Sequence, residues 1–520
     1  MMWAHIGRGR FAKRRMLICR SPPMKPEFSL VEYFPRISGF TGYLRNMSTV
    51  PTAIRHAVDQ FSQQHTIRFW DQLTDGERNQ LVAELTSTDL KQLREIWESN
   101  QKKTSEDSSS VARIERAVSP RTVIRQPVNK QDTQLWKEAA VLGEAELRSG
   151  KVAVVTVAGG QGTRLGFDHP KGMFPIGPVS DRTLFQIFAE QIQARRRRHN
   201  ASLLWLIMTS DATHQETVKF FEANDYFGMP GDSVSFFMQG SLPALDAATG
   251  RILLSSPSGL ALSPDGHGGL IMALKNAGLL DRMQQEGIEH VFYHQVDNPT
   301  VIISDPALIG FHVQKKSMLT TNVVRKTSPT ERMGVLVDVD DHTEIIEYSE
   351  LTPEQAAGSD ATGEWIFWAG NTAIHVFDRG FLQRLAEEGC RLPLHAARKK
   401  VPFLDDDGQL IQPTDSTNPN AIKLERFIFD ALPLAERTLI VEGNRDREFN
   451  PVKNKSGADS ADTARAALVR TGHQWLSSAG HAMPIEQLVE ISPLQALDAE
   501  ELQEKLADGR LSISDLTPTS

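Results

Sequence analysis

The chain has 520 residues, an apolar content of 40%, a net charge of −8 and a pI near 6.0. This length allows roughly two to four domains with sizeable cores, and the mildly acidic balance argues against a nucleic-acid partner, which needs a basic surface. No apolar run approaches the roughly 20 residues that span a bilayer, which argues against a membrane protein. With only two cysteines, Cys19 and Cys390, disulfides and thiolate metal sites are disfavoured, which indicates a reducing, cytoplasmic location.

The first 46 residues differ from the rest because they are basic and show no sustained periodicity. They lack the apolar core of a secretory signal, although their composition leaves an organelle transit peptide open. We expect Met47 to be the true start, with residues 1–46 a disordered or extraneous extension.

Residues 47–145 are predicted to form an N-terminal helical region. Thr74 and Glu77 have the spacing of a capping box and precede an apolar face. The polar stretch 104–110 is predicted to be a loop.

Residues 146–430 alternate between continuous apolar runs, typical of strands buried on both faces, and longer helical patterns. This alternation predicts an α/β fold: a Rossmann-like, mixed but mostly parallel sheet with helices on both faces and ligands beyond the carboxyl ends of the strands. Strands are predicted at 152–157, 203–208, 234–238 and 291–296, and helices at 183–197, 213–224 and 270–286. A small C-terminal region, 431–520, follows. The four arginines 195–198 are interpreted as a solvated helix end in preference to an anion-binding patch.

A glycine-rich segment directly follows the strand predicted at 152–157. It reads Ala-Gly-Gly-Gln-Gly-Thr-Arg-Leu-Gly over residues 158–166, followed by Pro170-Lys171-Gly172. Glycines let backbone N–H groups approach a phosphate and permit positive φ. Arg164 and Lys171 add positive charge beside those amides, so the segment predicts a cradle for a triphosphate.

Three other interpretations of this segment fit less well. A Walker A loop ends in Gly-Lys-Ser/Thr, which is absent here. A dinucleotide-binding fingerprint needs Gly-x-Gly-x-x-Gly, and counting from Gly160 the sixth position is Leu165. A structural turn alone does not require three glycines, an arginine and a Pro-Lys at this spacing.

Gly-Gly-x-Gly-Thr-Arg followed by Pro-Lys resembles the sugar nucleotidyltransferase superfamily. The surrounding sequence is similar to the eukaryotic-type UDP-N-acetylglucosamine pyrophosphorylases within the UDP-sugar pyrophosphorylase (UDPGP type 1) family. The resemblance extends over residues 69–494, with matching blocks at 239–244, 264–266, 296–298, 347–350, 369–371, 422–423 and 448–454. It implies a GT-A-like nucleotidyltransferase core that forms a UDP-sugar and pyrophosphate from UTP and a sugar 1-phosphate, here N-acetylglucosamine 1-phosphate.

The resemblance also implies roles for individual residues. Arg164, Lys171 and Lys453 match the catalytic cations, of which Lys453 holds the sugar phosphate. The UTP contacts it implies are Val157, Ala158, Gly159, Gly160, Lys171, Gln239, Gly266, Asp297 and Lys423, with Gln239 and Gly266 at the uracil. Glu347 and Asn371 match positions near the sugar ring. Asp297 follows a buried strand, where a carboxylate can hold Mg²⁺ against a phosphate; taken alone it also fits a turn before Pro299.

His267 departs from the pattern of the N-acetylglucosamine enzymes, which have asparagine in this Pro-Asp-Gly-x-Gly-Gly block. Gly-His-Gly resembles UDP-glucose and broad UDP-sugar pyrophosphorylases. An imidazole can hydrogen-bond a sugar hydroxyl or a phosphate, so His267 is a predicted sugar-binding residue, and local packing is the alternative. The sugar is therefore left open between an N-acetylhexosamine and a hexose.

A non-catalytic UDP-sugar-binding protein on the same fold is a further alternative. It is disfavoured because a sensor need not retain the charged groups of phosphate transfer, which this chain has as Arg164, Lys171, Asp297, Lys423 and Lys453.

Overall fold

The computed structural model describes residues 48–102, 108–413 and 418–517. The chain divides into two units, residues 1–44 and 45–520, and every described residue belongs to the second. The extension predicted at 1–46 lies outside the described residues. None of the helices in the described ranges combines the length and the apolar character that a bilayer span requires.

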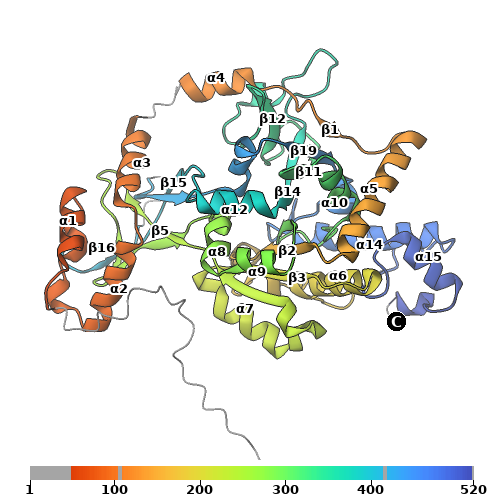
Figure 1. Ribbon diagram of the computed structural model, residues 1–520, viewed down its shortest axis with the longest axis horizontal. Coiled ribbons are helices and arrows are strands. Elements are labelled where there is room, and N and C mark those ends of the chain that lie inside the picture. Colours follow the sequence, from red (N-terminus) through yellow and green to blue (C-terminus); the bar gives the residue numbers. More distant parts are fainter. Residues whose placement is uncertain (1–47, 103–107, 414–417, 518–520) are drawn as a thin grey trace, which may run out of the picture. The chain divides into compact units, whose positions relative to one another are not determined.

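The centre of the second unit is a ten-stranded mixed sheet (Figure 1). Its order is β1 (Val123–Ile124), β19 (Thr438–Glu442), β11 (Leu319–Arg325), β14 (Ala369–Asp378), β10 (His290–Gln295), β2 (Val152–Val157), β3 (Leu204–Thr209) and β4 (Val234–Met238), with β12 (Val335–Val339) and β13 (His342–Ile346) beside β14. Neighbours are parallel except where β14, β12 and β13 take part. The predicted α/β class with a mixed, mostly parallel sheet is confirmed.

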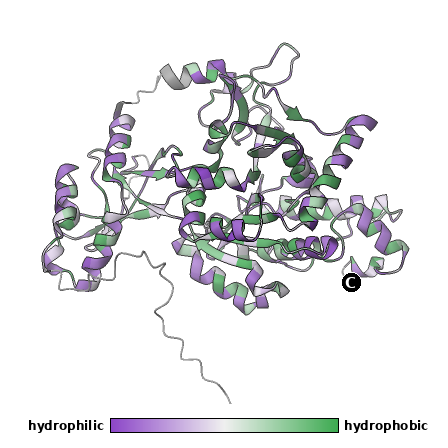
Figure 2. Ribbon diagram, in the orientation of Figure 1, coloured by the Kyte–Doolittle hydropathy of each residue, from purple (hydrophilic) through white to green (hydrophobic). Residues whose placement is uncertain are grey.

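The sheet is covered on both faces because successive strand residues point to opposite faces and both sets are apolar. In β2, Ala153 and Val155 pack with helices α8 (Leu270–Asn276), α9 (Leu279–Gln285) and α12 (Arg379–Glu387). Val152 and Val154 pack with α5 (Lys130–Arg148), α6 (Leu184–His199), α7 (Asp211–Ala223) and α10 (Pro306–Gln314). All four side chains are 0–1% exposed. In Figure 2 the hydrophobic residues accordingly gather along the strands.

Three local predictions need correction. The helix predicted at 270–286 is two helices, α8 (Leu270–Asn276) and α9 (Leu279–Gln285), because Gly278 adopts a φ of +68° between them. Residues 108–110 of the predicted loop at 104–110 are helical, because α4 (Ser108–Arg116) begins at Ser108. Residues 103–107 lie outside the described ranges. The helical region also contains strand β1, whose two residues pair only with a distant strand.

The other N-terminal helices support a small sheet that carries part of the candidate site. They are α1 (Thr52–Gln60), α2 (Asp75–Thr86) and α3 (Leu90–Lys102). The predicted capping box is confirmed, since the Glu77 carboxylate accepts a 2.8 Å bond from the Thr74 N–H. Leu81 and Leu85 pack in one cluster with Ile422 and Leu424. The small sheet has the order β15 (His395–Lys399), β18 (Ala421–Glu425), β6 (Leu245–Asp246).

The remaining elements are short connections and the C-terminal helices. Two-stranded ribbons are formed by β5 (Ser241–Pro243) with β9 (Leu262–Pro264), β7 (Leu254–Ser256) with β8 (Gly259–Leu260), and β16 (Phe403–Leu404) with β17 (Leu410–Ile411). The helices are α11 (Pro353–Ala356), α13 (Arg445–Glu448), α14 (Ala461–Ser478) and α15 (Ala499–Ala507).

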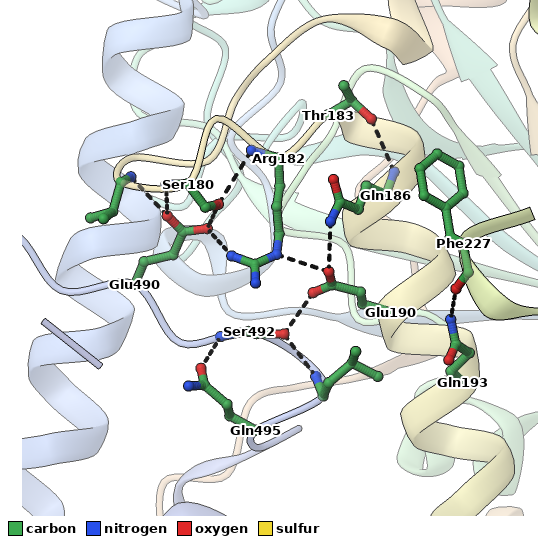
Figure 3. Close-up of polar contacts among 12 residues, drawn as sticks. Ser180, Arg182, Thr183, Gln186, Glu190, Gln193, Phe227, Glu490, Ser492 and Gln495 are labelled. Carbon is green, nitrogen blue, oxygen red and sulfur yellow. Dashed lines mark hydrogen bonds and ion pairs between the residues drawn. The ribbon is translucent and has the colours of Figure 1, made fainter. Parts of the chain in front are cut away.

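The C-terminal region is held to the core by a polar network around Glu190 of α6, shown in Figure 3. Glu190 is 4% exposed, accepts a 2.8 Å bond from Arg182 Nε and accepts a 2.6 Å bond from the Ser492 hydroxyl. Arg182 also reaches Glu490 at 3.1 Å, and Glu490 accepts two backbone N–H groups, from residues 179 and 180. A buried carboxylate is stable here because it is paired and hydrogen-bonded.

The arginine run at the end of α6 takes part in the same attachment. Arg195 is 4% exposed and donates to the carbonyl of Ile303 at 3.2 Å, and Arg198 pairs with Asp498 and Glu501. The interpretation of 195–198 as a solvated helix end is therefore wrong for Arg195, which is buried, whereas Arg197 and Arg198 are exposed in the last turn of α6 as predicted. The pattern alone did not reveal that residues 494–501 pack against this end.

Candidate active site

The glycine-rich segment and Asp297 meet at the carboxyl edge of the sheet. Strands β2 and β10 are parallel neighbours that end together, with Val157 opposite Gln295, and the Val296 N–H donates to the Val157 carbonyl at 3.0 Å. The residues that follow each strand are therefore adjacent. This is the edge at which parallel α/β sheets bind ligands.

The glycine-rich segment folds back on itself and presents a partly open face. Gly162 N–H donates to the His169 carbonyl at 2.9 Å, and Lys171 N–H donates to the Gly160 carbonyl at 3.0 Å. The Lys171 backbone is thereby fixed beside Gly160, which is exposed and has open space where a side chain would be. Arg164 is exposed on the same loop. The loop thus combines exposed glycine backbone with two basic residues, the composition that an anion cradle requires.

Gln239 lies against this loop from the end of β4. Its Oε1 is 2.8 Å from the position that a Cβ on Gly159 would take, so only glycine permits this approach. Ser210 fixes the same glycine by donating to its carbonyl at 2.8 Å. The structure therefore brings Gln239, a predicted uracil contact, next to the predicted triphosphate segment.

Gly266, a predicted uracil contact, lies against the residues that directly follow strand β18, which carries Lys423. Its φ is +85°, and a Cβ there would lie 2.4 Å from the Arg426 carbonyl oxygen. Hydrogen bonds of 2.7 and 2.8 Å from Arg426 N–H to Asp265 and from Gly268 N–H to Arg426 fasten the two segments together. A side chain at residue 266 would separate them.

Replacing Gly266 with alanine is expected to raise the KM for UTP at least about fivefold and to lower Tm, because the strained φ and the backbone overlap together cost several kcal/mol. Steady-state kinetics and thermal denaturation would measure both effects. Gly278→Ala is the matched control, because Gly278 has a φ of +68° but open space around it. Equal effects in the two variants would contradict this role for the close approach to Arg426.

Lys453 is held beside Asp297 by the backbone. Val452 N–H donates to the Asp297 carbonyl at 2.8 Å, and Lys453 N–H donates to the Asp459 carbonyl at 2.7 Å. The Lys453 ammonium lies 5.6 Å from the centre of the Phe449 ring. The side chain of Asn298 donates to the Glu448 carbonyl at 2.6 Å, which adds a second connection between the two segments. The segment that carries Lys453 is thus fixed to the backbone at Asp297, at the carboxyl end of β10.

Glu347 and Asn371 lie together across Gly334. Asn371 N–H donates to the Gly334 carbonyl at 2.8 Å, and a Cβ on Gly334 would lie 2.9 Å from Glu347 Oε1. Burial raises the pKa of Glu347, the nearby Glu350 adds to this, and Lys453 opposes it. The two predicted sugar contacts therefore share one location within electrostatic range of Lys453.

His267 makes its contacts within the protein. Its Nδ1 accepts a 3.2 Å hydrogen bond from the Ile428 N–H, and its ring stacks on Phe427 with centroids 5.4 Å apart and an interplanar angle of 21°. Burial lowers its pKa to about 4, so the ring is neutral near pH 7 with its proton on Nε2. A sugar contact from His267 stays a prediction, and Nε2 is the ring nitrogen left for it.

Comparison with known proteins agrees with this geometry. Residues 91–504 match the family model described as UTP–glucose-1-phosphate uridylyltransferase. The chain belongs to this family. Its relatives include the UDP-N-acetylglucosamine pyrophosphorylase of Saccharomyces cerevisiae, 35% identical over 84% of this chain and 93% of the relative. Another is the human UDP-N-acetylhexosamine pyrophosphorylase-like protein 1, which is 36% identical over 82% of this chain and 85% of the relative.

A solved structure supports the same assignment. The UDP-N-acetylglucosamine pyrophosphorylase of Trypanosoma brucei, crystallised with an inhibitor, has a TM-score of 0.73 and 26% identity, covering 88% of this chain and 96% of that one. This member of the uridylyltransferase family is therefore an enzyme of the nucleotidyltransferase class, and the resemblance stated from its motifs is confirmed.

For a metal, this uridylyltransferase offers the Asp297 carboxylate at the carboxyl edge. Asp297 is partly buried, follows β10 and has the oxygen chemistry that Mg²⁺ prefers. Among the described residues, the one close group of potential metal ligands is Glu146, Glu289 and His290. It lies at the opposite end of the strands, where Lys151 pairs with both carboxylates at 3.3–3.4 Å, which marks an ion-pair cluster.

Sequence reasoning did not single out His395 and Asp430. Their side chains are hydrogen-bonded at 2.8 Å across 35 positions of sequence, and both are within electrostatic range of Glu347. No motif spacing connects them. In the sequence, His395 precedes and Asp430 follows Lys423, a predicted site residue. This nearness in the chain was the available signal.

Proposed function

We propose that the enzyme transfers the uridylyl group of UTP to N-acetylglucosamine 1-phosphate, which forms UDP-N-acetylglucosamine and releases pyrophosphate. The observation that carries this proposal is the meeting of the glycine-rich loop, Asp297 and Lys453 at one edge of the sheet. The names of the yeast and Trypanosoma relatives support the choice of sugar.

The geometry suits an in-line attack by the sugar phosphate oxygen on the α-phosphorus of UTP. That oxygen needs no general base, because a phosphate monoester with a second pKa of about 6 is mostly dianionic near neutral pH. The difficulty is the approach of two polyanions, so catalysis depends on positioning and charge neutralisation. Lys453 would hold the sugar phosphate, while the amides of residues 158–160, Arg164, Lys171 and Lys423 would hold the triphosphate.

Asp297 would hold Mg²⁺, which supplies positive charge at the α-phosphate when bound. Val157, Gln239 and Gly266 would position the uridine at the other end of the nucleotide. Glu347 and Asn371 would hydrogen-bond the sugar hydroxyls.

Lys171→Ala is expected to raise the dissociation constant of UTP about tenfold or more, since hydrogen bonds to charged groups contribute about 1.5–3 kcal/mol. Turnover should fall as well. Calorimetric titration with UTP would measure the change. An unchanged dissociation constant in a folded variant would remove Lys171 from the triphosphate site.

A second candidate keeps this chemistry with glucose 1-phosphate or several sugar 1-phosphates as acceptor, and the Gly-His-Gly block at residue 267 favours it. Pyrophosphate release measured across a panel of sugar 1-phosphates separates the two. We expect the highest kcat/KM with N-acetylglucosamine 1-phosphate. Turnover of glucose 1-phosphate alone would reject the proposed sugar.

A further inference from the structure

Three aromatic rings form a stack beside the predicted sugar site. Phe427 stacks with His267 at 5.4 Å and 21° and with His395 at 4.4 Å and 26°. Among the described rings, no contact joins the two imidazoles directly, so the phenyl ring connects them. His267 is the more buried end of this stack, and His395, whose side chain is 43% exposed, is the open end.

Asp430 fixes the orientation of the open ring. His395 Nε2 lies 2.8 Å from Asp430 Oδ2, and the Asp430 side chain is only 17% exposed. Because an ionised carboxylate only accepts hydrogen bonds, Nε2 carries a proton and donates it. Nδ1 of His395 has no partner among the described residues. It is the polar atom that the stack and the carboxylate leave available.

The surroundings of His395 indicate which part of a substrate would meet it. His395 and Lys453 both act to lower the pKa of Glu347, a predicted sugar contact, against the larger upward effect of its burial. His395 begins β15 directly beside β18, the strand that carries Lys423. The glycine-rich loop follows β2 in the large sheet, whereas the Glu347 carboxylate and Asn371 lie against Gly334. Strand β13, which ends one residue before Glu347, packs against the segment Ile428–Leu434 that carries Asp430, so the His395–Asp430 pair lies beside this predicted sugar contact.

We propose that His395 contacts the sugar of the sugar 1-phosphate and sets sugar specificity, with Asp430 and His267 as positioning residues. This inference rests on the proposed function. With Nε2 donating to Asp430, Nδ1 is the ring nitrogen of His395 left for a hydrogen bond with a sugar hydroxyl or with an acetamido group. A polar contact of this kind, covered by the bound sugar, discriminates between sugars that offer the matching group and sugars that lack it.

The stack also explains how His267 can affect the sugar without touching it. Its Nδ1 is bonded to the Ile428 backbone, and its ring supports Phe427. A smaller side chain at residue 267 would let Phe427 move and carry the His395 ring with it. The departure from the family pattern would then change sugar preference through the aromatic stack.

The decisive experiment compares wild type with His395→Ala, Asp430→Asn and His267→Asn. His395→Ala should raise the KM for N-acetylglucosamine 1-phosphate about tenfold or more and leave the KM for UTP within about twofold. Asp430→Asn should raise the same KM by a smaller factor, because asparagine keeps an acceptor oxygen. His267→Asn should shift the ratio of kcat/KM between N-acetylglucosamine 1-phosphate and glucose 1-phosphate. His342→Ala, which removes an exposed histidine of β13, is the matched control and should change neither KM.

Ligand binding gives a readout that does not depend on turnover. Calorimetric titration should show that His395→Ala weakens binding of UDP-N-acetylglucosamine about fivefold or more and leaves binding of UDP, which has no sugar, unchanged. If wild type released no pyrophosphate, the proposed function would fail while this comparison still tested His395.

Two results would overturn the inference. One is a KM for the sugar phosphate that stays at the wild-type value in His395→Ala with an unchanged Tm. The other is an equal loss of affinity for UDP and UDP-N-acetylglucosamine, which indicates a structural role. If His395→Ala fails to fold, His395→Gln, which keeps a polar side chain, is compared with wild type in the same binding assay.

Discussion

Lys453→Ala is expected to lower kcat by about two to three orders of magnitude, while the dissociation constant of UTP changes less than about threefold. The reason is the position of Lys453 beside Asp297, fixed by backbone hydrogen bonds on both sides of the residue. From there the ammonium would neutralise the attacking sugar phosphate as it approaches the α-phosphate of UTP, and it would contribute little to UTP alone. Single-turnover kinetics and calorimetric titration would separate the two effects.

Two controls define this result. Lys315→Ala removes an exposed charge at the end of α10 and should leave both constants unchanged. Lys453→Arg keeps the charge with a different geometry and should recover part of the lost rate. Near-normal turnover in Lys453→Ala would exclude this lysine from the site.

Asp297→Asn should also reduce kcat by about two orders of magnitude or more, since a bound metal contributes several kcal/mol of transition-state stabilisation. An amide oxygen is a weaker ligand than a carboxylate, so the Mg²⁺ concentration for half-maximal rate should rise. The measurement is a Mg²⁺ titration of pyrophosphate release after treatment with a chelator.

Asp407→Asn, at an exposed aspartate on the turn between β16 and β17, is the control. Its Mg²⁺ dependence should match that of wild type. A variant at residue 297 with an unchanged Mg²⁺ requirement would argue that the metal is held elsewhere.

Much of the central fold could be predicted because its signals are local. The run at 152–157 is apolar except for Thr156, and strand β2 has these limits, with its first five residues buried. Residues 234–238 form β4 as predicted. The glycine-rich loop was recognisable since glycines recur where the backbone approaches Gln239 or turns with a positive φ. Each of these signals depends on neighbours within a few residues.

Features that depend on distant partners could not be predicted in this way. Arg198 looks like a surface charge until residues 498 and 501 pack against it. The break at Gly278 could be inferred only as a weak point in a helical pattern, because isolated glycines are tolerated within helices. His395 and Asp430 become a pair only when β15 and the segment after β18 come together. The roles of the predicted site residues await the variants described above.

The pairing of β1 has a consequence for synthesis of the protein. Its two residues pair with β19, Val123 opposite Ile440, so more than 300 positions separate the partners. Strand β19 also lies between β1 and β11, and this side of the sheet stays incomplete until residue 442 has been made. Contacts of such long sequence separation slow folding. The nascent chain should therefore expose apolar strand edges for most of translation, and we expect a marked dependence on chaperones during expression.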